Sequence, residues 1–298
     1  MPTAITNKQS RESNQLETGK TGSAKKTYDF FFTDEDFEYI RSLIYKIAGI
    51  SLSSSKKDLA YSRLSRRLRA RQIDSFNTYI QLLESGDVQE REEFTNALTT
   101  NMTSFFREPH HFKILSNHLG AISKSKLKPI HIWTCASSTG EEPYSIAITV
   151  AEHFQSFKTQ VKILATDIDT NVLEKAKQGQ YALQQLQTLS SSQIKRFFLK
   201  GSGRNTGLAK VRPELQQMIT FKKINLLDNS WGVREKFDAV FCRNVMIYFD
   251  KSTQYEILRK MHSCIQPNGL FFAGHSENFH QAADLFRIQG RTVYTPKS

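Results

Sequence analysis

The sequence has few cysteines and no long apolar segment. Its three cysteines, Cys135, Cys242 and Cys264, are an odd and sparse set without metal-ligand spacing, which excludes a disulfide framework and predicts no metal site. No apolar run approaches the roughly 20 residues of a membrane-spanning helix. Residues 1–28 are polar, lack the apolar core of a signal peptide and are typical of a disordered tail. We therefore expect a cytoplasmic protein without membrane insertion.

Acidic residues are in the minority. The chain has 29 Asp and Glu against 41 Lys and Arg, a net charge of +12. This surplus predicts an acidic partner such as nucleic acid, anionic lipid or an acidic protein. A solvated helix face explains the densest cluster about as well as a docking surface does. That cluster, within residues 53–71, contains Lys56, Lys57, Arg63, Arg66, Arg67, Arg69 and Arg71.

Residues 29–120 have the pattern of a small helical domain. Thr33 is a suitable N-cap for a helix with apolar residues at a 3.6-residue period, and Gly49 is placed to end it. A Ser- and Lys-rich linker at 121–128 follows the domain. The further expected helices are the basic segment 53–71, a short helix capped by Asp74 or Ser75, and residues 88–98.

Residues 129–298 instead alternate strands with helices, which predicts an α/β domain with a Rossmann-like, methyltransferase-type sheet. The last two strands are joined through Gly290, which is too short for a crossover and predicts an antiparallel hairpin. Residues 180–218 are too long for a plain connection and predict a small inserted antiparallel β-subdomain. The expected strands are 130–135, 161–166, 219–224, 237–242, 269–273, 284–289 and 291–295; the expected helices are 142–154, 170–178 and 251–265.

The first two expected strands carry a nucleoside-binding pattern. The strand 130–135 ends in a turn of small residues that lets the backbone approach a ligand, and the next strand ends at Asp167, which can accept hydrogen bonds from ribose hydroxyls. Glu141 and Glu142 open the intervening helix. They would repel a diphosphate but not a cationic sulfonium, which favours S-adenosylmethionine over NAD or ATP. Two acids in a first turn are also ordinary complements of the helix dipole.

Polar residues follow the third and fourth expected strands as well. Asn225 and Leu226 lie where an adenine commonly binds, although asparagine is also a turn former. Arg243 and Asn244 end the fourth strand, and Tyr248 follows in a position that predicts a reaction edge. Alternatively, Arg243 forms a structural salt bridge and Tyr248 packs in the core.

The segment before the linker places polar residues among aromatic ones. Asn101, Thr103 and Arg107 provide either a cap and a surface charge, or a lid that the helical domain contributes to the cofactor site. Both interpretations stay open on the residues alone.

Several runs are long enough to be specific: NALTTNMTSFFRE, STGEEPYSIAI, ATDIDTNVLEKA, INLLD, FCRNVMIYFD and AGHSENF. Over roughly residues 30–295 the chain resembles the chemotaxis receptor methyltransferases of the CheR family. The resemblance implies methylation of receptor glutamates by S-adenosylmethionine, with S-adenosylhomocysteine as the product. It implies cofactor contacts at Asn101, Thr103, Arg107, Glu142, Asp167, Asn225, Leu226, Arg243 and Asn244.

The resemblance also implies how a receptor is recognised. Tyr248 matches the family's reaction-edge tyrosine, and Arg63 and Arg69 match its substrate-facing basic helix, which also carries Arg66 and Arg67. Some members grip a receptor's C-terminal peptide with the inserted subdomain. Here the matching loop holds Lys200, Gly201 and Gly203, and Lys200 and Lys210 stand where close relatives use arginine. We expect a monomer that acts on an acidic helical receptor region and does not bind nucleic acid.

Methylation of a glutamate needs little acid–base chemistry. A carboxyl group with a pKa near 4.3 is ionised at neutral pH, so no general base is required. We expect Tyr248 or Arg107 to orient the carboxylate, and Phe105, Phe106 and Tyr248 to exclude water. Two alternatives remain: a nucleic-acid methyltransferase, whose Asn/Asp-Pro-Pro-Tyr/Phe motif is absent after the fourth strand, and a non-catalytic module that binds S-adenosylmethionine.

Overall fold

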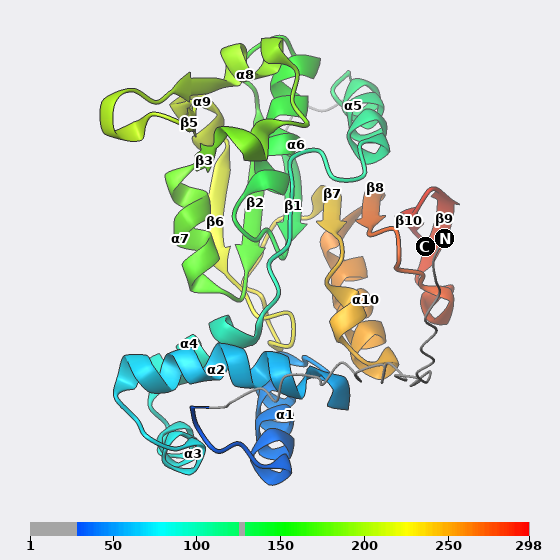
Figure 1. The fold of residues 1–298 in the computed structure, drawn as a ribbon. Helices are drawn as coiled ribbons and strands as arrows, with labels where there is room; N and C mark the ends of the chain where they lie inside the picture. Colours follow the sequence, from blue (N-terminus) through cyan, green and yellow to red (C-terminus); the bar gives the residue numbers. More distant parts are fainter. Residues whose placement is uncertain (1–28, 125–128, 298) are drawn as a thin grey trace, which may run out of the picture.

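The structure, a computed structural model, describes residues 29–124 and 129–297. The tail expected at 1–28 and half of the linker expected at 121–128 lie outside these residues. The helical part, blue to cyan in Figure 1, lies below a larger α/β part. Within the described ranges no helix combines the length and apolar character needed to cross a membrane.

Four α-helices form the N-terminal part as far as it is described, from residue 29 onward. Thr33 begins the first through a capping box with Asp36, in which each side chain accepts the other's backbone N–H at 2.9 Å. Gly49 ends this helix at φ 71°, and Ser75, not Asp74, caps the third. The elements are α1 (Asp34–Ala48), the 3₁₀ turn η1 (Ser54–Lys56), α2 (Lys57–Arg71), α3 (Phe76–Glu84) and α4 (Val88–Leu98).

A seven-stranded sheet forms the α/β part, in the order β6-β2-β1-β7-β8-β10-β9. Strands β6, β2, β1, β7 and β8 are parallel, and the buried runs of the central strands β1 and β7 are typical of a sheet covered on both faces. The hairpin of β9 and β10 is antiparallel, as expected from the short join, and β10 pairs antiparallel with β8. The predicted fold class is confirmed.

The strand and helix bounds differ from expectation mainly at β8, which begins four residues earlier than predicted. The strands are β1 (Ile130–Cys135), β2 (Val161–Asp167), β6 (Ile219–Lys223), β7 (Phe237–Cys242), β8 (Ile265–Ala273), β9 (Phe286–Gly290) and β10 (Val293–Pro296). The helices of this part are α5 (His110–Ile122), α6 (Glu141–His153), α7 (Thr170–Gln178) and α10 (Lys251–Cys264), with 3₁₀ turns η4 (Met246–Tyr248) and η5 (His280–Ala282).

Helix α5 packs with the α/β part and not with the helical part. Its buried residues Phe112 and Leu119 pack in one core with Ile132 of β1 and Ile146 of α6. The helical part has a separate core that ends near Leu98. The domain boundary expected after residue 120 is therefore corrected to a position before α5, because periodicity identifies a helix but not the core that its apolar face joins.

The expected insertion is present as a three-stranded antiparallel sheet in the order β3-β5-β4. It lies at the top of the α/β part in Figure 1, at the opposite end from the helical part. Its buried Phe197 and Phe198 join the core of the main sheet. Its elements are β3 (Gln180–Ala182), η2 (Leu183–Leu186), α8 (Ser191–Phe197), β4 (Phe198–Lys200), η3 (Gly203–Asn205), β5 (Leu208–Val211) and α9 (Pro213–Gln216).

Candidate cofactor and acceptor site

A cavity of about 450 Å³ lies where the carboxyl ends of β1, β2, β6 and β7 meet the helical part. Its volume is within the range of small-molecule sites. Lys56, Leu59 and Arg63 of α2 and its N-cap line it from the helical side. Every residue expected to contact the cofactor also lines it, together with Tyr248: Asn101, Thr103, Arg107, Glu142, Asp167, Asn225, Leu226, Arg243 and Asn244.

The turn after β1 brings the backbone close to this cavity. Ala136 and Ser138 have positive φ angles of 54° and 50°, so the chain turns sharply between β1 and α6. Gly140 has φ 100°, and a Cβ atom there would lie 2.7 Å from the Tyr181 hydroxyl. Only glycine fits this position, which explains the single glycine of the turn.

Asp167 is held at the end of β2 by backbone donors. Its carboxylate accepts the N–H of Ser138 at 2.8 Å and of Asp169 at 3.0 Å. Burial raises the pKa of Asp167 to about 6, against the effect of these hydrogen bonds. Asp169 caps α7 and also accepts the side-chain amide of Asn101 at 2.7 Å. The lid segment that carries Asn101 is therefore tied to the strand ends.

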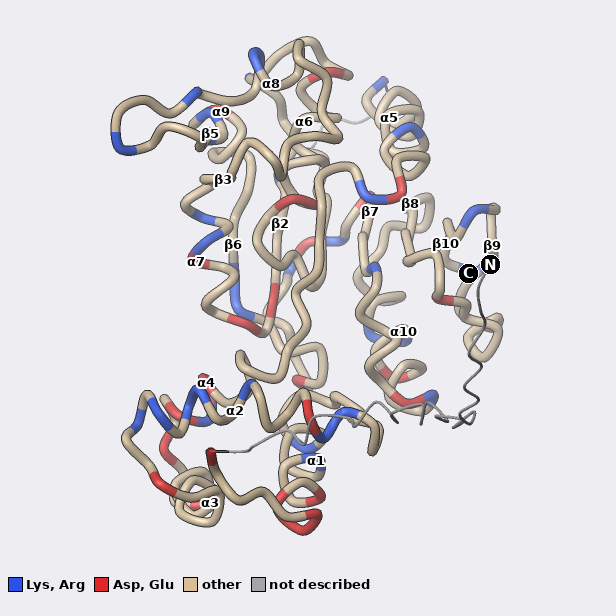
Figure 2. Tube along the Cα trace, viewed as in Figure 1, with Lys and Arg blue, Asp and Glu red and all other residues tan. Residues whose placement is uncertain are grey.

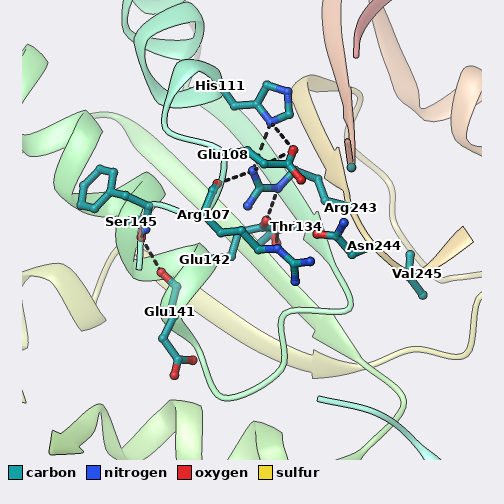
Figure 3. A network of polar contacts seen from close by, with 12 residues as sticks. Arg107, Glu108, His111, Thr134, Glu141, Glu142, Ser145, Arg243, Asn244 and Val245 are labelled. Carbon is teal, nitrogen blue, oxygen red and sulfur yellow. Dashed lines mark hydrogen bonds and ion pairs between the residues drawn. The ribbon is translucent and has the colours of Figure 1, made fainter. Parts of the chain in front are cut away.

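Arg243 is the centre of a buried polar network (Figure 3). Its Nε donates to Glu142 at 2.5 Å, and its Nη1 donates to the carbonyl of Arg107 at 2.6 Å and to Nδ1 of His111 at 3.1 Å. Thr134 donates to the second oxygen of Glu142 at 2.6 Å. Both carboxylate oxygens of Glu142 thus have partners within the protein. Glu142 orients Arg243 as well as lining the cavity.

His111 is neutral in this network. Its Nδ1 accepts from Arg243, so the proton lies on Nε2 and is donated to the carbonyl of Arg291 at 3.1 Å. Burial, followed by the charge of Arg243, lowers the pKa of His111 to about 4. No motif in the sequence identified His111, because its partners are distant in the chain.

Glu277 fixes the turn after β7, which carries Asn244, Val245 and Tyr248 among other residues of the cavity lining. The residue is 5% exposed, and its carboxylate accepts four backbone N–H groups, from Asn244 (3.0 Å), Val245 (3.0 Å), Met246 (2.8 Å) and Gly274 (2.6 Å). Asn244 is thereby held at φ 58°. The run AGHSENF contains Glu277, but its role could not be inferred from the sequence.

The cavity lining carries more positive than negative charge. Arg107, Arg63, Lys56 and Arg243 face two anionic residues. Arg243 has Glu142 as its partner, whereas Nη1 of Arg107 donates only to the carbonyl of Met102, at 3.1 Å, among the contacts of the described residues. The lining therefore has cationic donors suited to carboxylates, beside the acid at the end of β2.

The aromatic residues expected to exclude water do not all reach the cavity. Phe105 is fully buried and packs edge-on against Tyr181 and Phe198, with ring centroids 4.9 and 5.7 Å away. Phe106 stacks edge-on against Phe112 of α5. Neither lines the cavity, so the expectation was wrong for both; Tyr248 does line it.

The arginines of α2 divide into different roles. Arg67 is bidentate to the fully buried Glu90 of α4, at 3.0 and 2.8 Å, and so stabilises the helical part. Arg69 pairs with Asp29, and Arg66 is exposed. Figure 2 shows these basic segments of α2 among acidic segments of the same domain. The expected docking role does not suit Arg67, because its guanidinium is already occupied.

Arg63 lies at the cavity instead of on an open surface. Its Nη1 donates to the carbonyls of Thr99 at 2.5 Å and Ala97 at 3.3 Å. Arg63 therefore supports the segment that leads from α4 into the lid.

The inserted subdomain contributes nothing to the cavity lining. Lys200 ends β4, Gly201 lies in the loop that follows, and Gly203 begins η3, all at the edge of this subdomain. A Cβ atom on Gly201 would lie 2.1 Å from the carbonyl oxygen of Asn205, so this loop is closed tightly on itself. A role in recognition there has to be separate from the cavity.

The comparisons with known proteins agree with this geometry. Residues 101–295 match the family model described as "CheR methyltransferase, SAM binding domain", and residues 35–99 match "CheR methyltransferase, all-alpha domain". The chain belongs to the CheR methyltransferase family. These matches place the division between the two parts at residues 99–101, before α5. The chain is an S-adenosylmethionine-dependent methyltransferase, and neither rival interpretation is favoured.

Curated relatives cover most of the chain. Chemotaxis protein methyltransferase 2 of Pseudomonas aeruginosa is 51% identical over 268 residues, which cover 90% of this chain and 95% of the relative. The chemotaxis protein methyltransferase of Salmonella typhimurium is 47% identical, with 94% and 97% covered. The Escherichia coli chemotaxis protein methyltransferase is 46% identical, with 88% and 91% covered.

Proposed function

We propose that this CheR-family methyltransferase acts on glutamate side chains of chemotaxis receptors in the cytoplasm. The products are glutamate methyl esters and S-adenosylhomocysteine. The names of its relatives support a chemotaxis role. The observation that carries the proposal is the cavity itself, which joins an acid and an amide at the strand ends to surplus cations at the helical side.

We assign the cofactor contacts to the nine cavity residues already named. Asp167 suits ribose hydroxyls because its buried carboxylate lies at the end of β2. Asn225 and Leu226 suit an adenine, and Arg107 suits the carboxylate of the amino-acid portion. The lining therefore fits S-adenosylmethionine in size, in charge and in the types of its donors and acceptors.

When bound, S-adenosylmethionine supplies a methyl group on a cationic sulphur. The protein's task is to hold an ionised glutamate in line with that group and to exclude water, because a carboxylate needs no general base at neutral pH. Alignment of this kind contributes at most roughly 7–11 kcal/mol. We assign the orientation of the acceptor carboxylate to Tyr248, with Arg107 as a second donor, since both line the cavity.

Recognition of the receptor is assigned to two surfaces. Arg66 and Arg69 on α2, with Arg63 at the cavity, would attract an acidic helical receptor region and set its register. The loop of Lys200, Gly201 and Gly203 would bind a receptor C-terminal peptide where a receptor has one. Lysine lacks the planar fork of arginine, so we expect weaker binding of a peptide carboxylate than an arginine would give. A monomer suffices for both roles.

The direct test is methyl transfer to purified receptor cytoplasmic fragments with tritiated S-adenosylmethionine. We expect incorporation that mild alkali releases as methanol, since methyl esters hydrolyse whereas methylated amines and bases do not. A Tyr248→Phe variant should retain S-adenosylhomocysteine binding and lose turnover. Label that resists alkali, or label on nucleic acid, would overturn the glutamate assignment.

A further inference from the structure

Two large apolar side chains at the cavity are exposed. Met102 is 82% exposed and Ile247 is 52% exposed, and both line the cavity. Single exposed apolar side chains are ordinary on a protein surface, but two from distant segments at one cavity are not scattered. The two side chains therefore form an exposed apolar surface that a binding partner could cover.

Both residues are attached to site elements. Ile247 directly precedes Tyr248 in η4, within the turn that Glu277 fixes through four backbone N–H groups. Met102 lies between Asn101 and Thr103, and its carbonyl accepts from Arg107. These apolar surfaces are therefore held beside the polar groups of the reaction site.

The charges around these residues indicate the kind of partner. Lys56, the N-cap of α2, and Arg63 line the same cavity on either side of Leu59, at spacings of three and four residues, which places the three on one face at the start of the helix. The cavity lining thus combines apolar and cationic side chains. An acidic segment with apolar side chains next to its acid is complementary to both.

We infer that Met102 and Ile247 contact the substrate protein and select acceptor glutamates that have an apolar neighbour. The inference rests on the proposed glutamate methylation and names the sequence context that the same site accepts. Burying such a neighbour against Met102 and Ile247 removes apolar surface from water on both partners. A polar neighbour would not cover the apolar surface of Met102 and Ile247, so a substrate that carries one would bind more weakly.

The test uses a receptor cytoplasmic fragment with one methylatable glutamate, made with either leucine or serine beside it. For the wild-type enzyme we expect a kcat/KM about tenfold higher on the leucine fragment. Met102→Gln and Ile247→Gln should each lower that preference mainly through KM, and the two together should abolish it. Met102→Leu should keep it. Val88→Gln is the matched control, because Val88 is 79% exposed on α4 and away from the cavity.

Three results would overturn the inference. Equal rates on both fragments would show that no neighbour is selected. An unchanged preference in the double variant would place selection elsewhere. A weakened affinity for S-adenosylhomocysteine in the Gln variants, measured by calorimetry, would assign the apolar surface to the cofactor. If the wild-type enzyme gave no alkali-labile label on either fragment, the proposed function would fail instead.

Discussion

The buried floor of the cavity and its mouth differ in how their charged side chains are paired. The floor, which we define as the lining residues Glu142 and Arg243 with the supporting residues Thr134 and Glu277, has its charged groups paired or hydrogen-bonded inside the protein. The mouth, defined as Lys56, Arg63, Met102, Arg107 and Ile247, keeps cationic and apolar side chains at the cavity surface. The difference shows that the floor fixes geometry before anything binds, while the mouth is available for ligands.

The largest effect should come from breaking the floor at Arg243. Arg243→Ala leaves Glu142 buried without its charge partner, which typically costs about 3–5 kcal/mol of stability. We expect a lower urea midpoint and loss of methyl transfer. Arg243→Lys keeps the charge but cannot reproduce three hydrogen bonds from one planar group, so it should recover stability only in part. An Ala variant with wild-type stability would contradict the structural role of the pair.

At the mouth, Arg107→Ala should separate binding from stability. Loss of a charge-assisted hydrogen bond of about 1.5–3 kcal/mol would weaken S-adenosylhomocysteine binding by roughly 10- to 150-fold. The urea midpoint should hardly change, because only the backbone carbonyl of Arg107 belongs to the floor network. Calorimetry and urea unfolding measure the two quantities, with Arg66→Ala as the control. If Arg107→Ala lowered the free energy of unfolding as much as the free energy of binding, the Arg107 side chain would be part of the floor.

The pKa of Asp167 predicts a pH dependence of binding. Burial raises that pKa to about 6, and the ionised form is the better acceptor for ribose hydroxyls. Affinity for S-adenosylhomocysteine should therefore fall about tenfold between pH 8 and pH 5. Because the folded state binds this proton more tightly than the unfolded state, the Asp167 carboxyl group adds to the free energy of unfolding below about pH 4. That contribution is lost as the pH rises through about 6. Asp167→Asn should bind weakly at both pH values; a wild-type pH profile in that variant would refute the assignment.

The smallest effect should be that of Arg66, which lies outside the cavity lining. Arg66→Glu should raise KM for a receptor fragment a few-fold at low salt and leave kcat unchanged, since an exposed charge mainly steers association. The difference from wild type should vanish at high salt. Arg63→Glu should also lower kcat, because Arg63 supports the segment leading to the lid. A kcat loss in Arg66→Glu would mean that the steering role is wrong.

Local signals predicted the fold well. The cap at Thr33, the stop at Gly49 and the antiparallel C-terminal hairpin each depend on a few neighbouring residues, and the structure has all three. The turn of the hairpin is one residue later than expected, because Gly290 ends β9 and pairs with Val293. The strand ends likewise brought the predicted cavity residues together, because parallel strands end at one edge of a sheet.

The failures involve contacts between distant segments. Nothing near Arg67 in the sequence shows that Glu90, 23 residues later, occupies its guanidinium. Phe105 lies in the segment that was expected to cover the cavity, but its ring packs against Tyr181 of the insertion. His111 and Glu277 gain their importance from partners more than 30 residues away, so neither periodicity nor motif spacing could identify their roles.

We place the cofactor between the strand ends of the sheet and the helical part. A crystal structure of the protein with S-adenosylhomocysteine tests this placement most directly. We expect the ligand in the 450 Å³ cavity, with ribose oxygens about 3 Å from the carboxylate of Asp167. Ligand bound elsewhere, or a ribose turned away from Asp167, would contradict it.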